Sequence, residues 1–431
     1  MTEQRVQKLN ITKNHIYYDY LLYLCKVSKN LYNQALFIQR QAFFDSSYYI
    51  NYFELDKLTK ITSSPLYKNF HLLPSMVAQQ TLRVLDKNWK SYFESIKDYK
   101  KNPSKYIGRP KPPKYLDKDS YFNLYITDQS IHYENDTIRI SCFSKLFKEQ
   151  LKLNTKLSKI KDIQKINQIR ILPRSNKLIV EIIYIKEFNS EKYQGSKCIG
   201  IDIGIDNLLT ISGDVDSPII VNGKGLKSIN QFYNKRKAKM QSELMLKNKK
   251  HWSKNLQRLT DKRNNKIEDF IHKTSRWLIN FCLESGVSTI IIGKNKNWKQ
   301  KSKMNKINNQ NFIQIPFTIL EKQIDYKARE VGLNVIWQEE SYTSKASFFD
   351  NDKIPIFNIK KEKNEETAKH QFSGKRIKRG LYQTKDGFLI NADVNGSLNI
   401  LRKSKVACNT LERIKSASRG LVANPVKIVI F

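Results

Sequence analysis

The residue best placed to do chemistry is Asp202, which lies inside the apolar run Gly200-Ile201-Asp202-Ile203-Gly204. A carboxylate among β-branched side chains is costly to bury unless a cation compensates its charge, so this pattern points to a ligand for a divalent metal. The alternative is an aspartate that caps a turn before Gly204. An Asp-x-Gly motif after a strand also binds phosphate in actin-like kinases, but we find no second phosphate-binding hairpin in this sequence.

A second carboxylate, Asp393, stands at the start of the last helix that the pattern predicts, from about Val394. Aspartate is a good helix N-cap, and capping does not exclude metal binding, because one oxygen can accept a backbone N–H while the other faces an ion. Asn395 and Asn399 are four residues apart and share a helix face. We expect them to position Asp393 or to contact nucleic acid.

A regular order of strands and helices must position these two aspartates. Three predicted strands follow Gly195, and after them come a long polar helix, a strand at 288–293, a helix at 316–331, a strand at 333–340 and the last helix. This order is the one that an RNase H-like nuclease core needs. In the first half of the chain, helical periodicity predicts a small helical domain. Period-two patterning over about 120–187 then predicts an antiparallel barrel or sheet.

The charge of the chain restricts the class of partner. Its 77 basic and 40 acidic residues give a net charge of +37, and the usual compensation for such an excess is a polyanion, most often nucleic acid. Residues 106–116 combine basic side chains with prolines, so they must be extended and exposed, either as a linker or as a strap that contacts phosphates. Residues 226–266 are strongly basic with interleaved aromatics, which indicates an arm along a nucleic-acid backbone or a solvated helix hairpin.

Other sequence features indicate a cytosolic protein. The N-terminus has no apolar signal region, and no stretch reaches the eighteen or more apolar residues that a membrane span needs. The five cysteines are scattered without a C-x-x-C motif, so the sequence encodes neither a zinc ribbon nor a disulfide scaffold. We therefore expect the prokaryotic cytosol or nucleoid and no membrane partner.

Together these residues resemble the TnpB family of transposon-encoded, RNA-guided nucleases related to type V CRISPR effectors. The resemblance is carried by KNLYNQAL, LPSMVAQQTLRVL, GRPKPPK, GIDIGIDNLLTIS, NQNFIQIPFTILEKQIDYKAREVGLNV, ESYTSKAS and DVNGSLNI. It implies a multidomain α+β fold: an RNase H-like (RuvC) nuclease core with a helical recognition lobe and a β-barrel wedge domain. The implied boundaries are 1–12 and 106–195 for the wedge, 13–105 for the helical domain, 196–345 and 388–431 for the nuclease, and 346–387 for a target-nucleic-acid-binding insert.

The resemblance also implies a catalytic metal centre. RuvC nucleases hold two Mg²⁺ ions with three or four carboxylates, one ion activating water and the other stabilising the leaving oxygen. Asp202 matches the first catalytic aspartate of the family and Asp393 the last. The middle glutamate is missing, because the apolar strand runs into Gly293 and Lys294 instead.

We hypothesise that the missing glutamate has moved to Glu339 or Glu340, at the end of the next strand. Neighbouring strands lie about 4.8 Å apart, and Gly293 has no side chain to block the path of a strand-five glutamate toward Asp202. Successive strand residues face opposite ways, so only one of the two glutamates should serve. The alternative is a solvated strand end.

A second departure concerns the insert, where the family usually carries paired C-x-x-C knuckles. The matching positions hold Ser347, Asp350, Arg376 and Arg379, so we expect no zinc. The insert is polar and basic, which favours either an electrostatic clamp on a duplex or a mobile loop.

The leading interpretation is a transposon-encoded, RNA-guided, Mg²⁺-dependent DNA endonuclease that cuts target DNA next to a short adjacent motif. The expected partners are a guide RNA from the transposon end and double-stranded DNA, with base pairing reading the sequence; monomer or dimer is undecided. An RNA-guided DNA-binding protein without cleavage is the alternative, and a DDE-like transposase is a third possibility. The residues expected to contact nucleic acid are Arg109, Lys111, Lys114, Lys235, Arg236, Lys237, Lys249, Lys250, Trp298, Arg376, Arg379 and Asn395.

Overall fold

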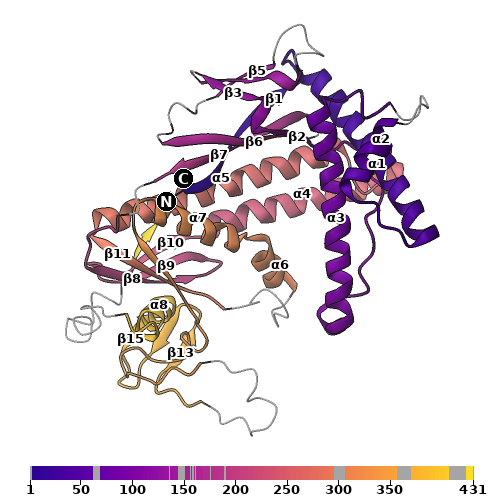
Figure 1. Cartoon of the computed structure of the whole chain (residues 1–431). Coiled ribbons are helices and arrows are strands. Elements are labelled where there is room, and N and C mark those ends of the chain that lie inside the picture. The colour runs from indigo at the N-terminus through magenta and orange to yellow at the C-terminus, as the bar shows by residue number, and fades with distance from the viewer. Residues whose placement is uncertain are drawn as a thin grey trace. The chain divides into compact units, whose positions relative to one another are not determined.

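The computed structural model divides the chain into two compact units, Met1–Phe188 and Asn189–Phe431, each with its own buried core (Figure 1). The structure describes residues 2–61, 68–134, 136–143, 151–155, 157, 160, 162–174, 176–188, 191–295, 306–356, 370–406 and 424–430. The finer division into four domains stays a prediction.

Three helices form the first part of unit 1: α1 (Tyr18–Ser46), α2 (Tyr52–Ile61) and α3 (Ser75–Lys101). The apolar residues that recur on one face of α1 and of α3 are buried, Trp89 among them. Where these two helices meet, the hydroxyls of Ser28 and Thr81 share a buried hydrogen bond of 2.9 Å. The helices that periodicity predicted here are present in the structure, whereas a separate helical domain stays a prediction.

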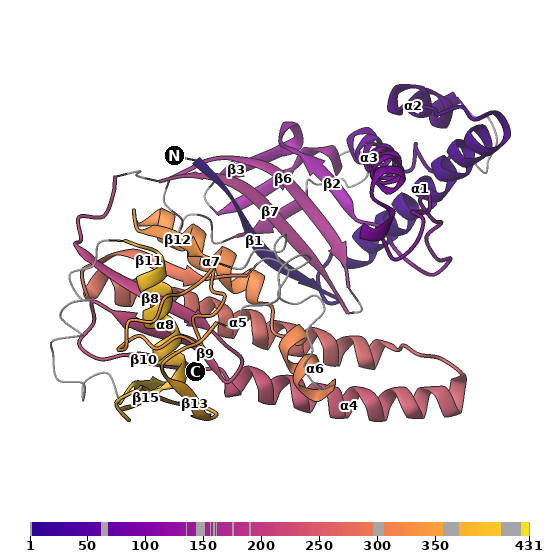
Figure 2. The same ribbon diagram turned by 90° about the horizontal axis from the view of Figure 1, so that it is seen from below.

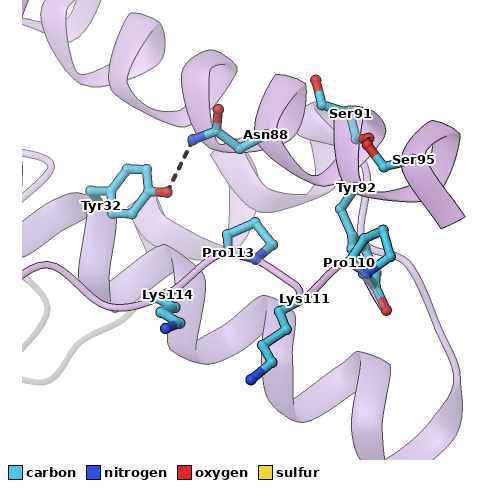
Figure 3. Close-up of a pocket in the computed structure, with 9 residues that line it drawn as sticks. All are labelled: Tyr32, Asn88, Ser91, Tyr92, Ser95, Pro110, Lys111, Pro113 and Lys114. Atoms are coloured by element: carbon cyan, nitrogen blue, oxygen red, sulfur yellow. Dashed lines mark hydrogen bonds between the residues drawn. The ribbon is translucent and has the colours of Figure 1, made fainter. Parts of the chain in front are cut away.

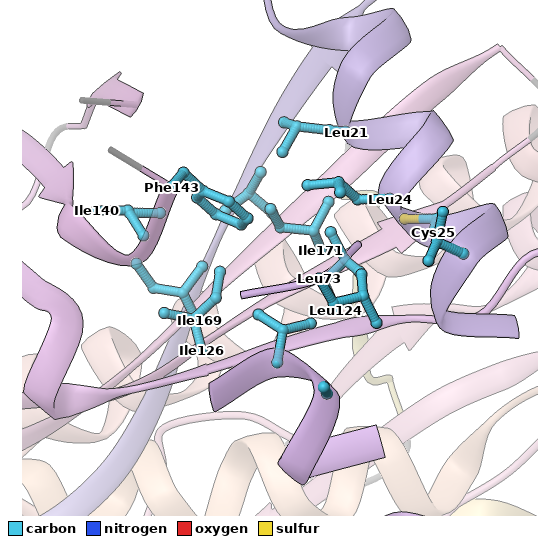
Figure 4. Packing of buried hydrophobic residues seen from close by; sticks show 14 of the residues in the cluster. Leu21, Leu24, Cys25, Leu73, Leu124, Ile126, Ile140, Phe143, Ile169 and Ile171 are labelled. Carbon is cyan, nitrogen blue, oxygen red and sulfur yellow. The ribbon is translucent and has the colours of Figure 1, made fainter. Parts of the chain in front are cut away.

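The strands of unit 1 form two antiparallel sheets. They are β1 (Thr2–Thr12), β2 (Leu124–Thr127), β6 (Ile163–Pro173) and β7 (Lys177–Glu187) in the order β1-β7-β6-β2, and β3 (Ile131–Glu134), β4 (Thr137–Ile140) and β5 (Leu151–Asn154) in a second sheet. Alternation along the strands buries Ile126, Ile169 and Ile171 in one core with Leu21 and Leu24 of α1 (Figure 4). The strands that are described leave both sheets open, so a closed barrel stays a prediction.

The basic proline segment is fixed to α1. Residues 109–116 contain no helix or strand. The Asn33 side chain donates to the Leu116 carbonyl and accepts from the Leu116 N–H, both at 2.9 Å, and Arg40 Nη1 donates to the Pro113 carbonyl at 3.0 Å. Of the two alternatives, a linker or a strap, these bonds favour the strap.

Short 3-10 turns stand at Pro103–Lys105, Asp128–Ser130 and Ser141–Phe143.

Unit 2 is built on a six-stranded sheet with the order β12-β11-β8-β9-β10-β16. Its strands are β8 (Lys197–Ile203), β9 (Asn207–Gly213), β10 (Ile219–Asn222), β11 (Val287–Gly293), β12 (Asn334–Gln338) and β16 (Val426–Ile428). β8, β9 and β10 form an antiparallel meander, whereas β11 and β12 run parallel to β8. The order of these strands along the chain agrees with the order expected from the sequence.

Helices cover both faces of this sheet. α5 (Lys254–Glu284) and α7 (Phe317–Glu330) pack on one face, and α8 (Ala392–Lys403) packs on the other. Along β8, Ile199, Ile201 and Ile203 share a core with α5 and α7, whereas Gly200 and Asp202 face α8. The alternation of a strand thus delivers Asp202 to the α8 side.

The long polar helix that the sequence predicted is in fact two. α4 (Lys224–Asn248) and α5 lie side by side as a hairpin (Figure 2). The break follows from local chemistry: Lys249 adopts the left-handed conformation at φ 50° that ends α4, and the Ser253 hydroxyl caps α5 by accepting from Leu256 N–H at 3.2 Å. A further helix, α6 (Lys306–Gln314), precedes α7.

Beyond β12, a small sheet of β13 (Lys375–Lys378), β14 (Leu381–Gln383) and β15 (Leu389–Asn391) leads into α8. Carboxylates hold the loops around this sheet. Asp350 Oδ2 accepts from Ser373 Oγ and from Lys385 N, both at 2.9 Å, and Asp352 Oδ2 accepts from Ser347 N at 2.7 Å. Hydrogen bonds to Asp350 and Asp352 thus tie this region together close to where the resemblance implies paired cysteines.

Within the described residues, no helix is long and apolar enough to cross a membrane.

Gly200 determines how closely α8 approaches the sheet. A Cβ there would overlap the Ser397 carbonyl oxygen and the Leu401 side chain of α8. We expect Gly200→Ala to lower the free energy of unfolding of the chain by about 1–3 kcal/mol, as overpacking typically does. Gly225→Ala is the matched control, because its Cβ would meet only Phe270 at 3.4 Å on an exposed helix position. Thermal and denaturant unfolding measure both; equal stability of the two variants would contradict the close packing.

Candidate active site

The register of three parallel strands places Gly293 beside Asp202. Ile292 of β11 pairs with Ile201 of β8, so the next residues, Gly293 and Asp202, are neighbours at the ends of these strands. On the other side, Gly293 pairs with Gln338 of β12. The position where the resemblance places the middle glutamate thus carries no side chain of its own and lies between Asp202 and the end of β12.

Helix α8 brings Asp393 to the same end of the sheet. The N-cap is not Asp393 but Asn391, whose side-chain oxygen accepts from the N–H groups of Asp393 and Val394 at 3.0 and 3.2 Å. The capping role considered for Asp393 was therefore wrong. Its carboxylate is held instead by Asn207 Nδ2 at 2.6 Å and Arg376 Nη2 at 3.2 Å.

The two candidate glutamates point in different directions. Glu340 turns toward β11, and its Oε2 lies 2.5 Å from where a Cβ on Gly293 would stand. Glu339 turns away and forms an ion pair of 2.5 Å with Lys403 of α8, whose side chain is only 6% exposed. The structure therefore brings Glu340 toward Asp202 and gives Glu339 a different partner.

An asparagine that the sequence reading missed holds Glu340 in place. Asn295 Nδ2 donates to Glu340 Oε1 at 3.3 Å, and Asn295 Oδ1 accepts from the Glu340 N–H at the same distance. Asn207 plays the corresponding part for Asp393. Asn207 begins β9 and Asn295 lies two residues after the end of β11. A position at a strand end is the signal in the sequence that could have identified them.

The electrostatics of the site favour a bound cation. Burial, with added repulsion from Asp393, raises the pKa of Asp202 to about 7. Burial also raises the pKa of Glu340 to about 8, and the charges of Asp202, Glu339 and Glu321 add to this effect. Carboxyls that resist ionisation because they are buried together become stable anions when a positive ion joins them.

Two arginines, Arg376 and Arg379, line the same pocket as the aspartates. The pocket has a volume of about 640 Å³ and is bounded by Asp202, Asp393, Arg376 and Arg379 together with residues 203–207. Arg376 pairs with Asp393, and Arg379 pairs with Asp206 at 2.5 Å. The pocket thus presents carboxylates and guanidinium groups side by side, which suits a metal and a phosphate respectively.

The donor set fits a hard divalent ion. Asp202, Glu340 and Asp393 offer only oxygen ligands, as Mg²⁺ prefers. Among the residues that the structure describes, no three His, Cys, Asp or Glu side chains already stand in a metal-ligand arrangement. The carboxylates would therefore have to close on an ion by side-chain movement.

The other residues expected to contact nucleic acid lie in four places. Lys235, Arg236 and Lys237 lie on α4, Lys249 and Lys250 lie in the turn after it, and Arg109, Lys111 and Lys114 lie on the exposed strap. Trp298 lies outside the described residues. The remaining residue, Asn395, is fully buried and bonds the Ala346 carbonyl and the Phe348 N–H, so its place is structural and the expectation of a nucleic-acid contact is not supported.

The opposite surroundings of the two glutamates predict opposite effects of pH. Because the pKa of Glu340 is raised, its protonated form favours the folded chain. This contribution to the free energy of unfolding is complete below about pH 4 and is lost as the pH rises through about 8. Without metal, we expect Glu340→Gln to raise the free energy of unfolding by about 2 kcal/mol at pH 9 and to leave it unchanged at pH 4.

Glu339→Gln is the matched control for this experiment. Burial opposes ionisation of Glu339, but bonds from Lys403 and Ser341 outweigh it and lower the pKa. Its contribution is therefore present above the usual carboxyl range and lost as pH falls, so Glu339→Gln should be less stable than the parent at pH 7–9. Denaturation in chelator across this pH series tests both, and shifts of the same sign would contradict the assignment.

Comparisons with known proteins agree with the resemblance seen in the sequence. Residues 179–299 match a family model described as "Probable transposase" (OrfB_IS605), and residues 317–400 match one described as "Cas12f1-like, TNB domain". A TnpB-like protein of Methanocaldococcus jannaschii is 27% identical over 215 residues, 48% of this chain and 68% of that protein. The CRISPR-associated endodeoxyribonuclease Cas12f2 of a Micrarchaeota archaeon is 27% identical over 223 residues, 50% of this chain but only 38% of its own length.

A solved structure shares the fold. The Cas12f1 chain of a cryo-EM complex with sgRNA and target DNA aligns with 89% of this chain and 82% of its own, at a TM-score of 0.55 and 15% sequence identity. The chain is thus similar in sequence to TnpB-like and Cas12f proteins, as its motifs indicated, and it shares the fold of Cas12f1.

Proposed function

We propose that this chain is an RNA-guided DNA endonuclease with an RNase H-like nuclease core, in which Glu340 replaces the glutamate missing at position 293. The observation that carries the proposal is the meeting of Asp202, Glu340 and Asp393 at one end of the sheet, where Gly293 leaves room for the Glu340 carboxylate. The similarity to TnpB-like and Cas12f proteins supports the same class of activity.

Each side chain then has a defined part. Asp202, Glu340 and Asp393 would hold Mg²⁺, which when bound lowers the pKa of water and neutralises charge on the leaving oxygen. Asn295 and Asn207 orient two of these carboxylates. Arg376 and Arg379, at the edge of the pocket, offer guanidinium groups to the phosphates of the strand being cut.

The partners follow from charge and from the relatives. A net charge of +37 favours a polyanionic partner, and the Cas12f1 structure is a complex with sgRNA and target DNA. We infer that this chain binds a guide RNA from the transposon end and double-stranded target DNA beside a short motif. The alternative, guided binding without cleavage, shares these partners and needs no complete carboxylate set.

Cleavage of a plasmid library tests the proposal. The full chain is co-expressed with its flanking transposon DNA and assayed with Mg²⁺ or chelator on targets with randomised adjacent sequence. We expect Glu340→Gln and Asp202→Ala to reduce cleavage at least about 100-fold with guided binding retained, because each removes a group that acts on the reacting phosphate. Glu339→Gln, folded at the assay temperature, should stay within about threefold of the parent.

A swap separates relocation of the glutamate from simple loss of it. Gly293→Glu combined with Glu340→Gly restores the carboxylate at the position where the family carries it, and we expect part of the activity to return. Full activity of Glu340→Gln would refute the role of Glu340. Guided binding with no cleavage by the parent chain in Mg²⁺ would establish the alternative.

A further inference from the structure

A second pocket, far along the sequence from the carboxylates, lies within unit 1. It has a volume of about 400 Å³ and is formed by α1, by α3 and by the strap of residues 109–116 (Figure 3). This volume is at the lower end of the range for small-molecule pockets, and the pocket is open on one side. An open pocket of this size suits one unit of a polymer better than an enclosed metabolite.

The inner wall offers a hydrogen-bond donor beside an acceptor. Tyr32 of α1 is 4% exposed, and its hydroxyl accepts from Asn88 Nδ2 of α3 at 3.1 Å (Figure 3). The hydroxyl proton of Tyr32 has no acceptor, and Asn88 Oδ1 no donor, in the described part of the chain. A neighbouring donor and acceptor of this kind match the edge of a nucleobase.

The other walls supply a hydroxyl and flat apolar surfaces. Ser91 and Tyr92 line the pocket from α3, and Pro110 and Pro113 line it from the strap. The Tyr92 ring is fixed by edge-on packing against Trp89, with centroids 5.8 Å apart. Aromatic and proline faces accept a flat base without regard to its identity.

Two ammonium groups complete the pocket. Lys111 and Lys114 line it from the strap, both are exposed, and neither forms an ion pair with any described residue. Bonds from α1 to the strap on either side of Lys114, at Pro113 and Leu116, fix the backbone that carries these lysines. Fixed cations at the mouth of a pocket favour an anionic ligand, and a phosphodiester fits the open side.

We propose that this pocket binds one nucleotide of a single-stranded nucleic acid, with the base edge at Tyr32 and Asn88 and the phosphate at Lys111 and Lys114. The proposal rests on the nucleic-acid partners inferred above and adds a defined subsite to them. It does not involve the carboxylate site, so the two can be tested separately.

The test measures binding of the full chain to 12-nucleotide homopolymers of each base, as DNA and as RNA, by fluorescence anisotropy over a salt series. Tyr32→Phe removes one hydroxyl without changing charge, and we expect it to weaken binding about 2- to 10-fold with an unchanged salt slope. Lys111→Gln with Lys114→Gln should reduce the salt slope by about 1.4, the value for two phosphate contacts to a single strand.

Matched variants outside the pocket are the controls. Tyr23→Phe alters an exposed tyrosine of α1, and Lys57→Gln with Lys100→Gln removes the same charge elsewhere in unit 1. If the parent binds nucleic acid and the pocket variants behave like these controls, the proposed nucleotide site is wrong and the proposed nuclease activity is unaffected. Absence of any nucleic-acid binding by the parent would overturn both. Comparison of the DNA and RNA oligomers shows which kind of strand the pocket binds. Comparison of the four bases shows whether the pocket distinguishes one base edge from another.

Discussion

The burial of two neighbouring carboxyl groups, Asp202 and Glu340, is the constraint on which the candidate active site depends. Burial is the main cause that raises the pKa of both groups, and repulsion adds to it, from Asp393 on Asp202 and from Asp202 on Glu340. The fold tolerates this arrangement because cationic and amide groups surround it: Arg376 and Asn207 on Asp393, and Asn295 on Glu340. Buried carboxyl groups are costly to ionise without a compensating cation, so their gathering at one end of the sheet supports a role in chemistry.

Small residues make the cluster geometrically possible. Gly200 lets α8 rest on β8, Gly396 lies with its missing Cβ only 3.0 Å from Asp202 Oδ2, and Gly293 clears the path of Glu340. Side chains at these positions would displace either the helix or the acids. The same close packing buries Asn395 and Asn399, whose amides tie α8 to the loop of residues 343–348.

The sequence pattern identified most of the helices and strands, together with Asp202 and Asp393, because strand alternation and helix periodicity are local properties. It could not choose between Glu339 and Glu340, since β12 ends at Gln338 and the alternation rule no longer applies to the turn that follows. It also left open a capping role for Asp393, because Asn391 and Asp393 are both good caps and only backbone geometry separates them. The expected contact of Asn395 with nucleic acid is not supported. Its spacing from Asn399 shows that both residues lie on one helix face, but spacing does not show whether that face is exposed.

Helix α8 joins the two sides of the site. Asp393 lies in its first turn, and Lys403, in its last turn about 15 Å away, bonds both Glu339 and the Ser341 carbonyl, the residues on either side of Glu340. A movement of this one helix therefore displaces two of the three acids together. The sheet of β13 to β15 leads directly into α8, so a ligand that engages this sheet would act on Asp393 through the helix that carries it.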